Sequence, residues 1–158
     1  MNNQEYERLV KLHIDSVYRV ALNGCQNPHD AEDIVQSTFM KLLERKDSFN
    51  DDDHARRWLI RVCVNECKNL WRSPWRSRTT SLEDIFQEPI FSSPEKSELY
   101  YAVNELPAKY RTLVYLYYFE GYTVKEIAAI MTISETAVQT RLYRARAHLK
   151  DRLKEAWQ

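Results

Sequence analysis

Along most of this chain, apolar residues recur every three or four positions and polar residues fill the positions between them. This spacing matches the helical turn of about 3.6 residues, so each such stretch predicts an amphipathic helix. The first stretch begins at Asn3, a good helix cap, and ends at Gly24, which adopts a helix-ending backbone without strain. Its apolar positions include Leu9, Val10, Ile14, Val17, Ala21 and Leu22.

Two more helices are predicted before the chain changes character. Asn27 followed by Pro28 is a cap with proline at the first helical position, so a helix should run from there to about Lys46. Its apolar stripe consists of Ile34, Val35, Phe39, Leu42 and Leu43. After an acidic loop at residues 51–53, a third helix should continue until Pro74 stops it. Its apolar positions are Trp58, Leu59, Val62, Cys63 and Leu70.

The helical pattern stops between residues 73 and 93, where Pro, Ser and Thr are frequent. We interpret this stretch as a flexible linker between an N-terminal domain, residues 1–72, and a C-terminal domain, residues 94–158. A fully extended chain of this length spans at most roughly 70 Å. That reach is about two turns of B-DNA, at roughly 34 Å each.

The helical pattern resumes at Pro94, restarts at Pro107 and pauses at Gly121. Only two glycines occur in the whole chain. Tight β-turns favour glycine, so the composition disfavours a β-rich fold. The predicted fold is all-α, with three or four helices packed together in each of two small domains.

A helix-turn-helix is predicted near the C-terminus. Thr123 and Glu126 have the spacing of a capping box, which predicts a short helix ending at Met131. After a tight turn, Ser134 caps a longer basic helix that should reach about Arg152. A short helix, a turn and a longer basic helix are typical of DNA-binding proteins.

The second helix of this motif separates a buried stripe from an exposed polar face. The buried stripe consists of Val138, Leu142, Ala145 and Leu149. The exposed face carries Thr136, Gln139, Thr140, Tyr143 and Arg144, and it is flanked by Arg141, Arg146 and Lys150. Arg and Gln pair well with base edges in the major groove, and flanking basic residues suit phosphates. The pattern predicts recognition of duplex DNA, with an ordinary amphipathic hairpin as the alternative.

Charge is balanced overall, with 23 basic and 23 acidic residues, but basic residues dominate residues 56–78 and 134–154. Two basic segments on a neutral chain predict two local contacts with anions, with solvated helix faces as the alternative. In the first segment, a basic row recurs at helical spacing around Asn65, which offers donors and acceptors to a base. The row consists of Arg57, Arg61, Lys68 and Arg72, and it predicts a contact with single-stranded DNA.

The remaining chemistry-bearing residues predict neither a catalytic site nor a metal site. Cys25, Cys63 and Cys67 include no CxxC pair, so we interpret them as small core residues, with a metal pair as the distant alternative. No histidine has ligand spacing, and no nucleophile elbow or phosphate loop occurs, so neither a cofactor nor enzymatic activity is expected. Without a signal pattern or a long apolar span, we expect a cytoplasmic protein with no membrane insertion.

Three segments resemble the extracytoplasmic-function (ECF) sigma factors of bacterial RNA polymerase. Residues 122–146 are similar to the DNA-reading helix-turn-helix of sigma region 4. Residues 30–39 and 58–65 are similar to the core-binding and promoter-melting helices of sigma region 2. The resemblance implies a non-enzymatic factor that binds core RNA polymerase and reads the −35 promoter element as duplex. It also implies recognition and opening of the −10 element, and regulation by an anti-sigma factor.

The resemblance implies roles residue by residue. The base-facing positions of region 4 are matched by Gln139, Thr140, Tyr143 and Arg144, and a backbone-contact position by Arg141. Positions near the opened strand are matched by Trp58 and Asn65, and positions facing polymerase by Asp33, Gln36 and Phe39. For Phe39 and Trp58 a core role is an equal alternative. Trp71 and Trp75 resemble a stacking surface, although a core role suits Trp71 better.

Thr132 departs from the family, many of whose members have glycine in the turn of the helix-turn-helix. A β-branched residue is costly at positive φ, so we expect a turn that avoids the left-handed region or is reshaped. Two other functional classes stay open at this point. One is a stand-alone dimeric helix-turn-helix regulator, which binds DNA without polymerase, and the other is an enzyme.

Overall fold

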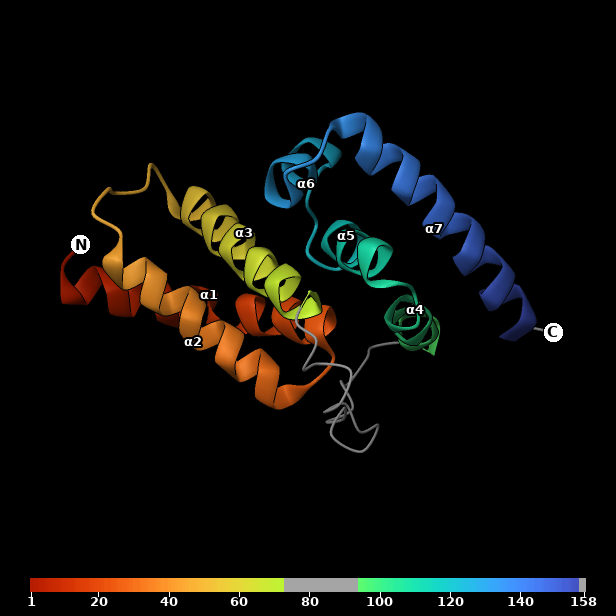
Figure 1. Cartoon of the computed structure of the whole chain (residues 1–158), viewed down its shortest axis with the longest axis horizontal. Helices are drawn as coiled ribbons and strands as arrows, with labels where there is room; N and C mark the ends of the chain where they lie inside the picture. The colour runs from red at the N-terminus through yellow and green to blue at the C-terminus, as the bar shows by residue number, and fades with distance from the viewer. Residues whose placement is uncertain (73–93, 157–158) are drawn as a thin grey trace. The chain divides into compact units, whose positions relative to one another are not determined.

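The computed structural model describes residues 1–72 and 94–156, and every regular element in these stretches is an α-helix (Figure 1). The helices are α1 (Asn3–Cys25), α2 (Pro28–Glu44), α3 (Asp52–Trp71), α4 (Pro94–Asn104), α5 (Ala108–Tyr118), α6 (Val124–Met131) and α7 (Glu135–Ala156). The chain divides into two compact units, Met1–Phe86 and Gln87–Gln158. The predicted all-α fold with two small helical domains is confirmed. The predicted linker lies outside the described residues.

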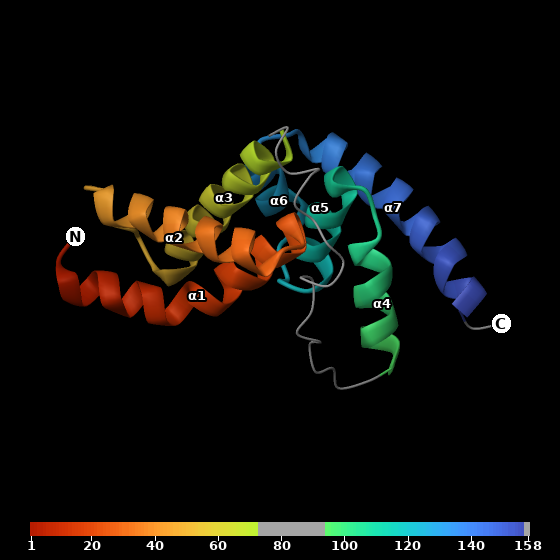
Figure 2. The same ribbon diagram turned by 60° about the horizontal axis from the view of Figure 1, so that its bottom comes forward.

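In the N-terminal unit, α1, α2 and α3 pack on one another as a three-helix bundle (Figure 2). Its fully buried side chains include Leu9, Val17, Leu42, Leu59 and Ile60. Most of the predicted apolar stripe of α2 is buried, but Leu43 is 59% exposed. On α1, Ile14 is 39% exposed. The assignment of these two residues to the core was wrong because each lies at the edge of its helix's apolar stripe.

Both predicted ends of α1 are displaced. The cap is Asn2 rather than Asn3, and its side-chain oxygen accepts a 2.8 Å hydrogen bond from the amide of Glu5. The helix continues through Gly24 to Cys25, and Gln26, at φ 56°, supplies the left-handed residue that ends it. Asp51 likewise caps α3, which places the other acidic residues of the predicted loop in its first turn. Carboxylates there are favoured by the helix dipole.

Gly24 allows α1 to lie close to α3. A Cβ atom at position 24 would stand 2.6 Å from Cys67 Sγ. The indole Nε1 of Trp71 donates a 2.7 Å hydrogen bond to the carbonyl of Gly24 at the same crossing. Cys63, Cys67 and Cys25 are all buried, as the core interpretation predicted. A hydrogen bond with Cys67, together with burial, raises the pKa of the Cys63 thiol well above its ordinary value.

In the C-terminal unit, α4, α5 and α6 each pack against α7, and α5 also contacts α4 and α6. Residues 110–116 of α5 are all buried, including Leu113 and Leu116, so this helix forms the centre of the unit. Gly121 lies at φ 75°, in the turn that leads from α5 to α6. A glycine adopts this backbone without the strain that a side chain causes. Helix α5 therefore contacts and supports both α6 and α7.

Candidate functional site

The predicted helix-turn-helix is present as α6 and α7. In the capping box of α6, Thr123 Oγ1 accepts from the Glu126 amide at 3.1 Å, and Glu126 Oε1 accepts from the Thr123 amide at 3.0 Å. Ser134 Oγ accepts from the Ala137 amide at 3.0 Å, as predicted for the start of the second helix. These caps satisfy amides that begin each helix, and they define the turn between them.

The turn uses the left-handed backbone despite its threonine. Thr132 lies at φ 58° and ψ 48°, and its amide donates to the carbonyl of Ala128. The expectation that the turn avoids this region was therefore wrong. The amide of Ile133 also donates to the Ala128 carbonyl, at 3.0 Å, and these two bonds hold Thr132 in its costly conformation.

Thr132→Asn and Thr132→Gly are expected to raise the free energy of unfolding of the C-terminal unit. A left-handed β-branched residue costs about 1 kcal/mol, and the exposed Thr132 side chain makes little compensating contact. Urea unfolding followed by hydrogen exchange at α6 and α7 measures the change. Thr136→Asn, an exposed position inside α7, is the control and should give no gain. If neither Thr132 variant is more stable than the wild type, the left-handed backbone at Thr132 is not strained.

The outer face of α7 is polar and solvent-exposed. Val138, Leu142, Ala145 and Leu149 are buried, as the wheel predicted. Thr136, Gln139, Thr140, Tyr143 and Arg144 are all exposed, and Tyr143 is 75% exposed. Arg141 is half-buried at the edge of this face. The helix therefore offers a hydroxyl-, amide- and phenol-bearing surface of the kind that fits a major groove.

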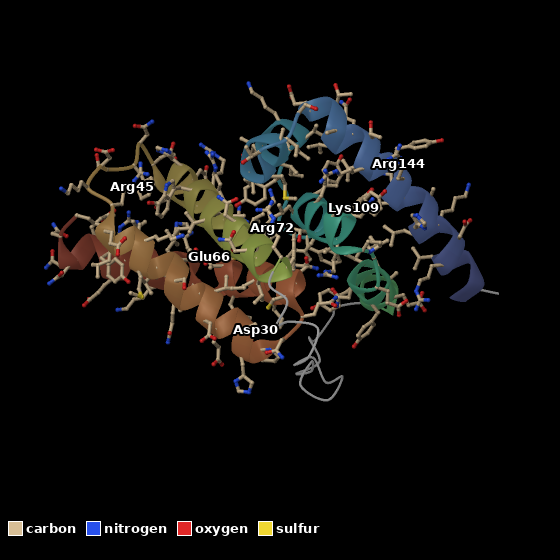
Figure 3. The ribbon with its side chains drawn as sticks, in the orientation of Figure 1. Asp30, Arg45, Glu66, Arg72, Lys109 and Arg144 are labelled. Carbon is tan, nitrogen blue, oxygen red and sulfur yellow. The ribbon has the colours of Figure 1, made fainter. Side chains whose placement is uncertain are left out.

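One arginine on α7, Arg146, contacts two tyrosines of α5. Arg146 Nε donates a 2.7 Å hydrogen bond to the Tyr118 hydroxyl, and its guanidinium lies 5.6 Å from the Tyr117 ring centre. Burial raises the pKa of the Tyr110 phenol on α5, but Arg144 and Lys109 outweigh burial and lower this pKa overall (Figure 3 labels both basic residues). The Arg146 side chain is therefore anchored at one end. The sequence pattern missed these partners because it treated α7 alone.

On α3, the residues predicted to meet single-stranded DNA lie at the surface. Arg61, Asn65 and Arg72 are exposed, whereas Arg57 and Lys68 are half-buried. Trp71 is different, because its indole bonds to Gly24 and supports the bundle, in agreement with its core interpretation. Trp75 lies outside the described residues.

Trp58 belongs to an aromatic and cationic cluster at the start of α3. Its ring centre lies 5.7 Å from that of Phe49, and the Arg45 guanidinium lies 4.3 Å from the Phe49 ring centre and 5.1 Å from that of Trp58. His54 meets Phe49 edge-on at 5.2 Å. Sequence analysis missed Arg45 and Phe49 because both lie between helices, where no periodic signal exists. An aromatic residue just before an acidic cap was the available clue.

The residues predicted to face polymerase do not share one environment on α2. Asp33 lines a cleft between α2 and α3 together with Ile34 and Glu66. Gln36 lines a groove between α2 and α1. Phe39 is only 6% exposed, and its carbonyl accepts a hydrogen bond from the Tyr6 hydroxyl, so its side chain belongs to the core.

The same helix exposes two large apolar side chains that the sequence analysis did not assign to an interface. Met40, one turn after Gln36, is 61% exposed, and Leu43, about two turns after Gln36, is 59% exposed. Exposed apolar side chains beside polar ones are typical of a protein interface. The periodic pattern of apolar residues did not identify Met40, because Met40 lies outside the predicted apolar stripe of α2.

Two features are absent from the described residues. Within residues 1–72 and 94–156, none of the helices has both the length and the hydrophobicity needed to cross a bilayer. The same residues contain no group of three or more His, Cys, Asp or Glu side chains placed to hold a metal ion.

Comparison with known proteins gives a consistent result. The family Sigma-70 region 2 matches residues 9–79, and the family Sigma-70, region 4 matches residues 96–149. The ECF RNA polymerase sigma factor SigM of Bacillus subtilis is 30% identical, over 91% of this chain and 92% of that protein. SigE of Mycolicibacterium smegmatis, also an ECF RNA polymerase sigma factor, is 28% identical over 94% of this chain. The chain spans only 61% of that relative's length.

A solved structure is also similar. The sigma factor RpoE of Bartonella quintana, crystallised with the anti-sigma factor NepR, has a TM-score of 0.78 and 26% identity. The match covers 96% of this chain and 98% of that one.

Proposed function

Because this chain belongs to the sigma-70 family, in its extracytoplasmic-function group, we propose that it binds core RNA polymerase and directs it to particular promoters. In this proposal the C-terminal unit reads the −35 element as duplex DNA, and the N-terminal unit recognises and opens the −10 element. The factor itself performs no catalysis.

The observation that carries the proposal is the capped helix-turn-helix with its exposed polar face on α7. Thr136, Gln139, Thr140 and Tyr143 extend from this face while the opposite stripe packs on α5 and α6. A helix supported in this way can enter a major groove with its polar side chains directed at base edges. Gln139 is the side chain best suited to a bidentate contact with a base.

For the −10 element, the proposal assigns the exposed face of α3. Arg61 and Arg72 supply positive charge on either side of Asn65, whose amide can pair with an unstacked base. Trp58 offers an aromatic surface at the start of the same helix, backed by Phe49 and Arg45. Proteins bind single-stranded DNA with basic side chains that contact its phosphates and with aromatic rings that stack on its bases.

For core polymerase, the proposal assigns α2. Asp33 and Gln36 are exposed polar groups, and Met40 and Leu43 add apolar area on the same helix. A polar rim around exposed apolar side chains fits a protein interface. Phe39 supports this surface from beneath, because it is buried. We propose an anti-sigma factor as a further partner, in analogy with the complex of the Bartonella quintana relative.

Transcription with purified core RNA polymerase tests the proposal. The full-length chain, added to core enzyme and a library of genomic fragments, should yield transcripts from a small set of promoters. Core enzyme alone, and core enzyme with a Gln139→Ala and Thr140→Ala double variant, should not yield this set. The proposal is wrong if the chain neither co-purifies with core enzyme nor directs transcription. Tight dimeric binding to DNA without polymerase would instead identify a stand-alone regulator.

A further inference from the structure

The loop that joins α2 to α3 is held by hydrogen bonds at both of its ends. Figure 3 labels Arg45, the residue that ends α2. Its Nε donates a 3.1 Å hydrogen bond to the carbonyl of Asp47. At the other end of the loop, the Asn50 amide donates a 3.1 Å hydrogen bond to Nδ1 of His54. The His54 amide in turn donates a 2.7 Å hydrogen bond to Oδ1 of Asp51, the cap of α3.

Between these two ends, the guanidinium of Arg45 lies close to two aromatic rings. Its central carbon is 4.3 Å from the ring centre of Phe49 in the loop and 5.1 Å from that of Trp58 on α3. The two rings are 5.7 Å apart and tilted by 57°. All three side chains are half-buried, and partial desolvation strengthens the attraction between a cation and a ring. One arginine therefore joins the end of α2, the loop and α3.

These contacts order a loop whose backbone is otherwise open to solvent. Lys46, Asp47, Ser48 and Asn50 are all exposed, so their own side chains bury little surface. Loops of this kind are mobile unless other groups hold them. A loop that becomes ordered only on binding costs conformational entropy at that moment, and a loop ordered in advance avoids this cost. Arg45 can thus affect binding at the Trp58 ring without a contact of its own.

We propose that Arg45 is a positioning residue for opening of the −10 element: its guanidinium orders residues 46–51 and thereby orients the Trp58 ring for an unstacked base. This inference rests on the proposed opening of promoter DNA by the N-terminal unit. The competing role for Arg45 is attraction of DNA phosphates by its positive charge. The two roles differ in what they require, because any basic side chain supplies charge, whereas only a planar guanidinium can lie against both rings and bond to Asp47.

The test uses the full chain in holoenzyme with core RNA polymerase, on a promoter that the wild-type holoenzyme selects. Arg45→Gln should slow promoter opening about tenfold, as expected for the loss of two cation–π contacts. Binding of core enzyme, and binding of the promoter while it is still duplex, should not change. Permanganate reactivity of thymines around −10 measures opening, and binding at a temperature that keeps the promoter closed measures the duplex complex.

Arg45→Lys separates positioning from charge. Its ammonium keeps the positive charge but has neither a planar face nor the Nε–H that bonds to Asp47, so opening should be nearly as slow as in Arg45→Gln. Lys46→Gln is the matched control, because it removes the same charge from the next residue, which is exposed. It should open the promoter at the wild-type rate. In a Trp58→Ala background, Arg45→Gln should cause no further slowing, because Arg45 acts through that ring.

Hydrogen exchange at the Asn50 amide reports the order of the loop independently of DNA, since this amide bonds to His54. In the full chain without polymerase, Arg45→Gln should make exchange at Asn50 about tenfold faster, by the same loss of cation–π contacts. Amides in the middle of α3 should keep their protection, because the change is confined to the loop.

Three results would overturn the inference. Opening at the wild-type rate by Arg45→Lys would make charge the cause. Wild-type exchange at Asn50 in Arg45→Gln would show that the loop is ordered without Arg45. Faster exchange at Asn50 together with wild-type opening would leave Arg45 a purely structural role. Failure of the proposed function looks different, because the wild-type holoenzyme then opens no promoter. The positioning role fails with it, whereas exchange at Asn50 still shows whether Arg45 orders the loop.

Discussion

Asp33→Lys is expected to weaken binding of core RNA polymerase at least about a hundredfold, because a like charge brought into an interface costs several kcal/mol. Asp33 is exposed on α2 and lines the cleft between α2 and α3 with Glu66, where it can receive a cationic side chain of the partner. Adding Gln36→Ala, one turn further along α2, should abolish binding. Pull-down of core enzyme with the full chain measures both variants.

Two controls separate lost contact from lost fold. Glu44→Lys makes the same change of charge on an exposed residue at the C-terminal end of α2, and it should bind polymerase within about threefold of the wild type. Circular dichroism of Asp33→Lys should be unchanged, since the side chain is exposed. Phe39→Ala, by contrast, should lower the stability of the bundle by about 3 kcal/mol, as for other buried phenylalanines. If Asp33→Lys binds core RNA polymerase as the wild type does, α2 does not form the interface with polymerase.

Local signals in the sequence were sufficient to predict most of the fold. The capping box at Thr123 and the cap at Ser134 are formed by residues three apart, so their hydrogen bonds depend on no distant contact. The buried stripe of α7 was predicted for the same reason, since its members repeat at a single helical period. Interactions within one helix are encoded where they occur.

Contacts between helices were harder to predict. The partners of Arg146 are tyrosines on α5, and a wheel drawn for α7 contains no information about them. Arg45 and Phe49 were missed because a loop has no period that could align them with Trp58. Tertiary packing decides the direction of such side chains.

Gly24 shows how tertiary packing can reverse a local signal. Glycine is favoured just after a helix, and that preference predicted the end of α1 at this position. The structure instead keeps Gly24 helical and places Cys67 Sγ only 2.6 Å from the position that a Cβ atom would take. Gln26 then takes the left-handed conformation that glycine usually provides. The close approach of α3 thus explains a glycine that helix propensity alone would disfavour.

Gly24→Ala is therefore expected to destabilise the N-terminal unit by about 1–2 kcal/mol, although alanine favours helices. Alanine gains at most about 1 kcal/mol of helix propensity over glycine. Against this gain, the new methyl group stands 2.6 Å from Cys67 Sγ and 3.2 Å from Cys67 Cβ, inside a packed crossing. Overpacking of a core typically costs about 1–3 kcal/mol, and shifting α3 also weakens the Trp71 bond to the Gly24 carbonyl.

The double variant Gly24→Ala with Cys67→Ala identifies the clash as the cause. Removing the sulfur leaves only the milder 3.2 Å contact, so the double variant should be more stable than Gly24→Ala alone. The coupling between the two positions should reach about 1–2 kcal/mol, as for residues in direct contact. Cys63→Ala is the matched control, a buried cysteine one turn earlier, and its coupling to Gly24→Ala should be close to zero. Hydrogen exchange at α1 and α3 in the full chain gives the free energies. A Gly24→Ala protein as stable as the wild type would show that α1 and α3 can separate at no cost, contrary to the packing described for this crossing.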